Sequence, residues 1–248
     1  MSTLIMERTP PCLSVKGLIK AFGGLTALGN VGFEVDERSI FGIIGPNGAG
    51  KTTLFSCLSG LLCPDAGSIV FHGAELAGQA PAAVCRHGIA RTFQIVRPFH
   101  GMTVLENVMV GAFFRHRARA AARRAAEGVL EQLGMQALAA RDAASLGVAD
   151  LRALEVARCL ATEPKLLLLD EMLAGLTRPE AERMGRKIQD LRDGGMTIML
   201  VEHSVPAIAS LCDRVLVLNF GEVLAQGPTD GVLRDPAVEA AYLGKAHR

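Results

Sequence analysis

The chain has 248 residues, of which 50% are hydrophobic and 21% charged, and its formal net charge is +1. This composition excludes a disordered, highly charged tail protein, and the near-zero net charge gives no general reason to expect a nucleic-acid partner. The mean hydropathy of +0.30 is high, but apolar runs such as residues 166–169 end at a charge long before the roughly 18 to 20 residues that a membrane span needs.

Short aliphatic and β-branched runs along the chain predict strands. Several of them are continuously apolar and bounded by Gly, Pro or Asp, which is typical of strands buried on both faces of a mainly parallel sheet. In chain order the expected strands cover residues 12–16, 31–35, 40–44, 68–72, 165–169, 197–201, 214–218 and 222–225.

Helical segments are expected between these strands. They cover residues 51–61, 118–133, 150–161, 179–190 and 205–212. Strands that alternate with helices predict an α/β fold. The stretch from about residue 103 to 160 has helical segments and no strand pattern, which indicates a separate helical lobe.

An Ala- and Arg-rich segment lies inside this lobe. Its arginines are Arg115, Arg117, Arg119, Arg123 and Arg124. The simplest interpretation is a solvated helix, and contact with a lipid headgroup or RNA is the alternative. The sequence leaves the role of this segment open.

The cysteines and the N-terminus favour a cytoplasmic protein. The six cysteines are scattered without a C-x-x-C pair, which in a chain of this length is typical of reduced core residues rather than disulfides or a zinc site. The N-terminal segment has acids and prolines early and lacks an uninterrupted apolar stretch, so no secretory signal is predicted.

Residues 45–52 fit the pattern G-x-x-x-x-G-K-[ST] between an expected strand and an expected helix. Glycines let the backbone approach a phosphate and point successive N–H groups at it, and the helix N-terminus adds the positive end of its dipole. Lys51 would reach the β- and γ-phosphates, and the Thr52 hydroxyl can bind Mg²⁺. A mere Gly-rich turn is the alternative, but the context favours a nucleoside triphosphate. The expected binding residues are Gly45, Pro46, Asn47, Gly48, Ala49, Gly50, Lys51, Thr52 and Thr53.

The apolar run at residues 166–169 ends in two acids, Asp170 and Glu171. A buried strand would deliver Asp170 to its carboxyl end, where it can hold Mg²⁺ opposite Thr52. Glu171 can orient and polarise a water for in-line attack on the γ-phosphate. Such a run alone is an ordinary strand terminus, and the upstream loop favours the functional interpretation. His203 follows the next expected strand, beside the same pocket, although a lone histidine there is commonly structural.

Together these residues resemble the ATP-binding subunits of ABC transporters, and the resemblance covers nearly the whole chain. The Thr-Phe-Gln sequence ending at Gln94 is similar to the Q-loop, and His203 to the switch histidine. The segment around Phe22 is similar to the adenine-stacking segment, although Phe22 alone would be an ordinary core residue. The resemblance implies ATP and Mg²⁺ as cofactors, with Gln94 joining Thr52 and Asp170 around the metal.

Finer similarity points to one branch of this family. Residues 88–94 and 102–108, and the tail from 218 to 244, are similar to branched-chain amino-acid importer ATPases. The implied fold is a P-loop NTPase core, with a mainly parallel sheet, flanking helices and an antiparallel β part, and an inserted helical subdomain. The core is expected over residues 1–95 and 162–248, and the subdomain over approximately 96–161.

The resemblance also implies partners and a mechanism. Two ATPase subunits would close head to tail on two ATP molecules, each site joining one chain's phosphate loop to the other's signature segment. Closure would drive two transmembrane permease subunits between inward-facing and outward-facing states, and a solute-binding protein would deliver the solute to them. The chain would therefore lie peripherally on the inner face of the cell membrane, bound to the permease subunits. Glu171 would be the general base or water-orienting group, and His203 would sense the γ-phosphate. No nucleic-acid partner is implied.

The signature segment departs from the family pattern. Family members carry LSGGQ or a relative such as LAYGQ, and this chain has Leu146, Gly147, Val148, Ala149 and Asp150. The Cβ atoms of Val148 and Ala149 disfavour left-handed backbone and keep a phosphate away. Asp150 brings a negative charge that is unsuited to a phosphate and suited to a helix N-cap. We therefore predict that this degenerate segment caps a helix and binds ATP poorly.

The departure has an asymmetric consequence, because each site is shared between two subunits. The weak signature would impair the site on the partner's phosphate loop, and this chain's own site would remain competent, so we expect a heterodimer that needs a partner ATPase for full activity. Met172 and Thr177 also depart from the usual residues near the subunit contact. The alternatives are a non-hydrolytic, ATP-binding regulatory subunit and a soluble ABC protein of translation or DNA repair. Related small polar solutes, such as urea, amides or aromatic acids, remain open as cargo.

Overall fold

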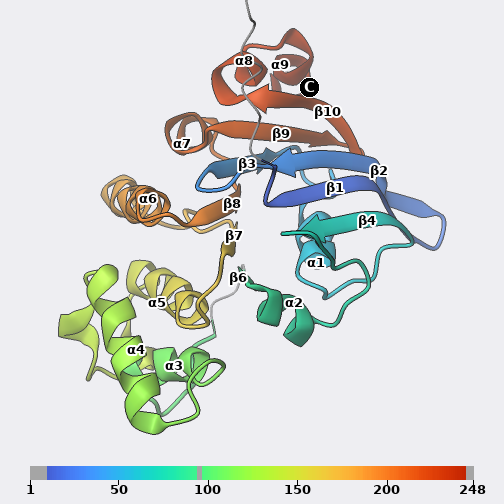
Figure 1. The fold of residues 1–248 in the computed structure, drawn as a ribbon. Helices are drawn as coiled ribbons and strands as arrows, with labels where there is room; N and C mark the ends of the chain where they lie inside the picture. The colour runs from blue at the N-terminus through green and yellow to red at the C-terminus, as the bar shows by residue number, and fades with distance from the viewer. Residues whose placement is uncertain (1–9, 94–96, 244–248) are drawn as a thin grey trace, which may run out of the picture.

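The computed structural model describes residues 10–93 and 97–243, which form two β-sheets with helices packed around them (Figure 1). One sheet has six strands in the order β10-β9-β3-β8-β7-β6, and the other has four in the order β2-β1-β4-β5. The strands are β1 (Leu13–Phe22), β2 (Leu25–Val35), β3 (Ile40–Ile44), β4 (Ala66–Phe71), β5 (Ala74–Glu75), β6 (Ile89–Arg91), β7 (Leu166–Asp170), β8 (Thr197–Val201), β9 (Arg214–Asn219) and β10 (Glu222–Pro228).

Helices connect many of these strands. They are α1 (Lys51–Leu58), α2 (Pro81–His87), α3 (Val104–Ala112), α4 (Arg119–Gln132), α5 (Val148–Leu160), α6 (Arg178–Asp193), α7 (Val205–Leu211), α8 (Thr229–Leu233) and α9 (Pro236–Leu243), with short 3₁₀ turns at Gln136–Leu138 and Ala143–Ser145. No helix within the described part of the chain is long and apolar enough to cross a membrane.

The six-stranded sheet is parallel except at one edge. Strands β6, β7, β8, β3 and β9 pair in parallel, and β10 pairs antiparallel with β9. The four-stranded sheet is antiparallel. The predicted α/β core with a mainly parallel sheet and an antiparallel part is therefore confirmed. Because carboxyl ends of parallel strands share one edge, the segments that follow β3, β7 and β8 lie near one another.

The strands of the parallel sheet are buried on both faces, as their continuous apolar runs predict. Every residue of β3, β7 and β8 is buried. Along β3, Ile40 and Ile44 join an apolar cluster with α5, α6 and α7, whereas Phe41 and Ile43 join another with α1 and the antiparallel sheet. Helix α1 therefore lies between the two sheets, which fixes the position of the loop that precedes it.

Helices α3, α4 and α5 pack mainly on one another and lie at the lower left of Figure 1. A capping box between Thr103 and Glu106 begins α3, a helix that the sequence analysis overlooked despite its T-x-x-E pattern. Helix α4 begins at Arg119, so Arg115 and Arg117 precede it. We refer to α3, α4 and α5 with their connections as the helical lobe, and its boundaries at residues 96 and 161 stay a prediction.

All six cysteines are free. Cys12, Cys57 and Cys212 are buried, as expected for reduced core residues. Cys63 is exposed, so the expectation of a core position is wrong for this residue, which lies in the loop after α1 rather than in an apolar element.

Candidate functional site

The loop between β3 and α1 has a backbone that requires glycine. Gly50 is the N-cap of α1 with φ of 104°, and a Cβ atom there would lie 2.5 Å from the carbonyl oxygen of Ala27 in β2. Gly48 also has a positive φ, of 81°. The first turn of α1 contains no acid, so the positive end of its dipole is not neutralised locally. The loop therefore has the form of an anion-binding cradle at a helix N-terminus.

Lys51 is buried at the start of α1 and folds back over this loop. Its Nζ donates hydrogen bonds to the carbonyl oxygens of Gly45, at 2.7 Å, and Pro46, at 3.1 Å. Burial lowers the pKa of Lys51, and the nearby charges of Glu171 and Asp170 oppose that shift. The ammonium group thus lies near the loop and near two acids, where it could pair with a bound phosphate.

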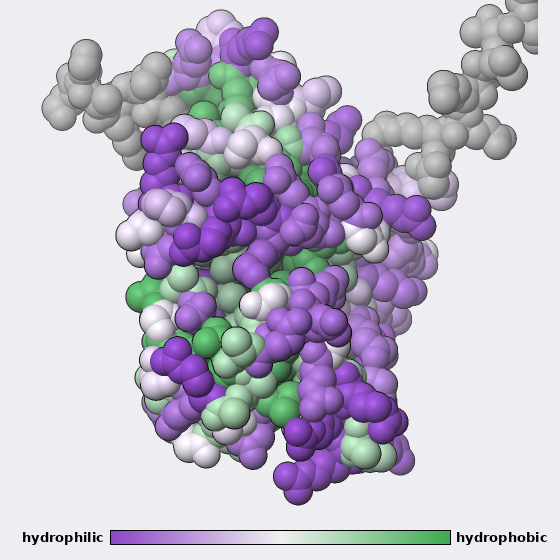
Figure 2. All heavy atoms as spheres, turned by 90° about the vertical axis from the view of Figure 1, so that its left-hand side faces the viewer, coloured by the Kyte–Doolittle hydropathy of each residue, from purple (hydrophilic) through white to green (hydrophobic). Residues whose placement is uncertain are grey.

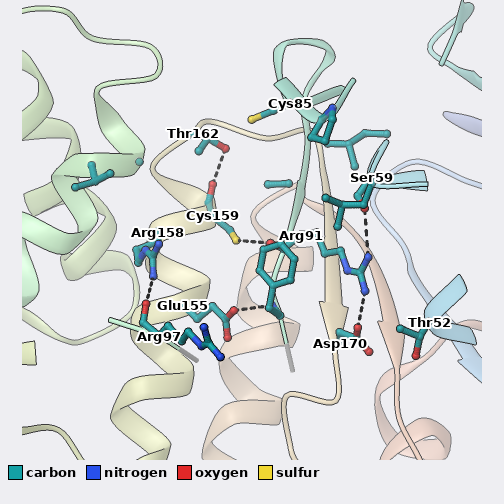
Figure 3. Close-up of a pocket in the computed structure, with 17 residues that line it drawn as sticks. Thr52, Ser59, Cys85, Arg91, Arg97, Glu155, Arg158, Cys159, Thr162 and Asp170 are labelled. Carbon is teal, nitrogen blue, oxygen red and sulfur yellow. Dashed lines mark hydrogen bonds and ion pairs between the residues drawn. The ribbon is translucent and has the colours of Figure 1, made fainter. Parts of the chain in front are cut away.

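Asp170 ends β7 and is buried, with 3% of its surface exposed. Its Oδ2 accepts a hydrogen bond from Arg91 Nη2 at 2.9 Å, and its backbone N–H donates to Thr92 Oγ1 at 3.0 Å. Asp170 and Thr52 line the same cavity of 710 Å³, which extends to the helical lobe (Figure 3). One hydroxyl and one carboxylate suit Mg²⁺, which keeps several waters and takes its other ligands from a bound phosphate.

Glu171 and His203 are in direct contact. His203 Nε2 lies 2.7 Å from Glu171 Oε1, and the backbone N–H of Glu171 donates to the carbonyl oxygen of Val201 at 3.0 Å. Glu171 has φ of 51°, a left-handed conformation that is uncommon outside glycine and that concentrates at functional sites. The structure therefore brings together the acid and the histidine that follow two neighbouring strands.

Two buried glutamates hold the segments next to these residues, and the sequence analysis missed both. Glu202 Oε1 accepts from the backbone N–H of Leu173 at 2.8 Å, and Glu155 Oε1 accepts from that of Phe93 at 2.5 Å. Burial raises the pKa of each carboxyl group. A glutamate beside His203 or within an amphipathic helix carries no signal of this role in the sequence.

Two predicted residues are not part of this cluster as described. Gln94 lies outside the described residues. Phe22 ends β1 and is 48% exposed, and it is absent from the described lining of the cavity that contains Thr52 and Asp170. Lys20 Nζ lies 5.6 Å from the centre of its ring. The assignment of Phe22 to adenine stacking stays a prediction, because an exposed ring is a requirement for stacking rather than a proof of it.

The segment predicted to be a degenerate signature starts α5, but Asp150 is not the N-cap of this helix. Gly147 is the N-cap, with an extended backbone, and Asp150 lies in the first helical turn. The prediction for Asp150 is wrong because glycine adopts an extended cap position readily, while an acid also stabilises the first turn through the helix dipole. Leu146 is buried and Val148 is 56% exposed.

Comparisons with known proteins agree with this geometry. The family model described as ABC transporter matches residues 28–174. The high-affinity branched-chain amino acid transport ATP-binding protein LivG of Salmonella typhimurium is 42% identical over 95% of this chain and 99% of its own length. The corresponding protein BraF of Pseudomonas aeruginosa is 39% identical over the same shares. A crystal structure of the ADP conformation of an ATP-binding cassette of an ABC transporter superposes with a TM-score of 0.87, at 30% identity, over 96% of this chain and 100% of that chain.

Proposed function

Because this chain belongs to the ABC transporter family, we propose that it is the ATP-binding and ATP-hydrolysing subunit of an importer. The cargo class we propose is branched-chain amino acids or related small polar solutes, which the names of LivG and BraF support. The observation that carries the ATPase proposal is the gathering of Lys51, Asp170 and the Glu171–His203 pair at one edge of the parallel sheet.

Each of these residues has a distinct part in the proposed reaction. The loop N–H groups and Lys51 would offset phosphate charge, and Thr52, Asp170 and Gln94 would hold Mg²⁺, which neutralises phosphate oxygens when bound. Glu171 would orient the attacking water and draw on its proton, while His203 holds the Glu171 carboxylate in place. Phe22 would stack on adenine through its exposed ring.

The proposed partners are a second ATPase subunit, in a head-to-tail pair, and two transmembrane permease subunits. A solute-binding protein would deliver the solute to the permease subunits. Apolar side chains gather on the molecular face at the height of the helical lobe (Figure 2). Val110, Phe113 and Phe114 of this lobe are exposed, and Val110 lines the cavity that reaches Asp170. We propose that a permease docks here, which would place the chain on the inner face of the membrane. In this proposal residues 1–95 and 162–248 form the nucleotide-binding core, and residues 96–161 form the helical subdomain.

The degenerate signature favours a second candidate, a regulatory subunit that binds ATP but turns it over weakly. Val148 and Ala149 are the first two residues of α5, so their Cβ atoms lie at the start of this helix, at the two positions where family members usually offer glycine backbone. On the leading proposal, this weakness affects only the partner's site, and the complex is a heterodimer. The two candidates differ in whether this chain's own Glu171 turns over ATP.

The deciding experiment measures ATP binding and hydrolysis by the chain with its partner ATPase subunit. Glu171→Gln should retain ATP binding and lower the hydrolysis rate by about 10²–10⁴-fold, as loss of a general base does. Lys51→Ala should lose both. A matched control is Glu163→Gln, because Glu163 also has a positive φ, of 53°, and also contacts a histidine, His116, at 2.7 Å, on the protein surface.

The control should hydrolyse ATP like the wild type. Full hydrolysis in Glu171→Gln would refute the catalytic assignment and favour the regulatory candidate. Loss of turnover on mutation of the partner's phosphate-loop lysine, with none on Lys51→Ala, would reverse the assignment of the competent site. Absence of ATP binding by the wild-type chain would refute the proposed function as a whole.

A further inference from the structure

Arg91 is a buried arginine that the motifs do not account for. It is the last residue of β6, and its side chain is only 6% exposed. Its Nη2 donates to Asp170 Oδ2 at 2.9 Å, and its Nη1 donates to Ser59 Oγ at 3.3 Å (Figure 3). Nη1 also donates to Ser56 Oγ at 3.1 Å. One guanidinium group therefore bonds the end of β7 and the side of α1.

Aromatic rings contact the guanidinium group from α1 and from the segment after β6. The Phe55 ring of α1 is 5.7 Å from Arg91 Cζ, and the Phe93 ring, after β6, is 5.6 Å away. A buried cation–π contact is stronger than an exposed one, because less water competes for the cation. The position of the charge is thus set by packing, unlike that of a surface ion pair, which exchanges readily with solvent.

This geometry links two of the three proposed metal ligands, Asp170 and Thr52. Arg91 bonds Asp170 directly, and it bonds Ser56, whose Oγ donates to the carbonyl oxygen of Thr52 at 2.7 Å. A donor on one carboxylate oxygen fixes the plane of the carboxyl group while the other oxygen keeps its lone pairs for a ligand. Arg91 therefore sets both the orientation of Asp170 and the separation of β7 from the first turns of α1.

We infer that Arg91 is a positioning residue for Mg²⁺: it orients Asp170 and holds it in register with Thr52 so that the two can share one metal ion. The inference rests on the proposed ATPase function. Removing a group that holds a metal ligand in place typically lowers the metal affinity by about 10–100-fold. The opposite effect is competition, in which the guanidinium would occupy Asp170 and weaken metal binding.

The test is a Mg²⁺ titration of mant-ATP fluorescence on the purified chain, which reads metal binding independently of hydrolysis. Arg91→Met should raise the Mg²⁺ concentration at half-saturation about 10–100-fold, with metal-free mant-ATP affinity unchanged. Arg91→Lys, which keeps the charge but not the fork of donors, should recover part of the loss. Arg158→Met is the matched control, because Arg158 lines the same cavity, donates to the Arg97 carbonyl oxygen at 2.9 Å and makes no described contact with Asp170.

The outcomes separate the inference from the function on which it rests. An unchanged or lower half-saturation in Arg91→Met overturns the inference, while a wild-type chain that binds no mant-ATP overturns the proposed function. Where Arg91→Met fails to fold, Arg91→Lys decides, because it keeps the charge and loses the fork of donors that bonds Asp170 and the two serines together. A raised half-saturation in Arg91→Lys supports the inference, and an unchanged one refutes it.

Discussion

Two glycines of the phosphate loop should respond very differently to the same substitution. Gly48 and Gly50 both have positive φ, of 81° and 104°. A Cβ atom at Gly48 would meet nothing within 4 Å, whereas one at Gly50 would lie 2.5 Å from the Ala27 carbonyl oxygen and 3.0 Å from Leu28 Cδ2. The pair therefore separates backbone strain from steric clash within one loop.

The expected magnitudes follow from these contacts. Left-handed backbone costs an L-residue roughly 1–2 kcal/mol, which is the whole expected loss of unfolding free energy for Gly48→Ala. Gly50→Ala adds displacement of the β2 backbone, for which overpacking values of about 1–3 kcal/mol apply. We expect a total loss of about 2–5 kcal/mol for Gly50→Ala. The gain from a less flexible unfolded chain is common to both variants and cancels in the difference.

Urea unfolding of both variants and the wild type, monitored by circular dichroism, provides the measurement. The slope against urea concentration should stay constant, so that a shift in midpoint reports stability. Equal losses of unfolding free energy in the two variants would refute the steric reasoning. They would mean that the Cβ position at Gly48 is not open or that the Cβ position at Gly50 is not blocked.

Three further predictions concern the core, a buried acid and the thiols. Leu168→Ala, in the fully buried β7, should lower the free energy of unfolding by about 2–5 kcal/mol, and the part-exposed Leu224→Ala by less than about 0.5 kcal/mol, both by urea unfolding. Burial raises the pKa of Glu155 above its ordinary value of 4.5, so its stabilising contribution is present below pH 4.5 and is lost as pH rises through the raised value. Stability measured at increasing pH should therefore fall less in Glu155→Gln than in wild type, and an equal fall would contradict the assignment. Iodoacetamide at pH 8 should label exposed Cys63 first, while buried Cys212, whose pKa burial raises to about 12, should react only on unfolding, as mass spectrometry of peptides would test.

Much of the core could be predicted from sequence because its strands are buried on both faces. Continuous apolar runs give the same signal whichever face a residue occupies, and β3 and β8 have the expected bounds. Strand β6 was missed because three residues are too few for a pattern. Strand β1 extends to Phe22, beyond the expected end, because it pairs with β2 through a turn at two glycines, and the register shifts along this pairing leave no regular pattern in the sequence.

The charged residues of the site could be predicted, and the groups that hold them could not. Asp170, Glu171 and His203 stand in recognisable motifs, directly after apolar strands. Arg91 and Glu155 act through contacts with residues 79 and 62 positions away in the chain, and no local pattern encodes such a separation. Their roles follow from the tertiary structure, in which β6 lies next to β7 and α5 approaches the segment after β6.

These supporting groups also explain how the helical lobe and the site are mechanically connected. Glu155 belongs to α5, and its side chain accepts a hydrogen bond from the N–H of Phe93, whose ring also contacts Arg91. Arg91 in turn holds Asp170 and α1. A displacement of α5 would therefore act on Phe93 first and reach Asp170 through one further side chain. Glu155 and Arg91 are buried and Phe93 is 51% exposed, so we expect a displacement of α5 to alter the Phe93–Arg91 contact before it alters the position of the Asp170 carboxylate.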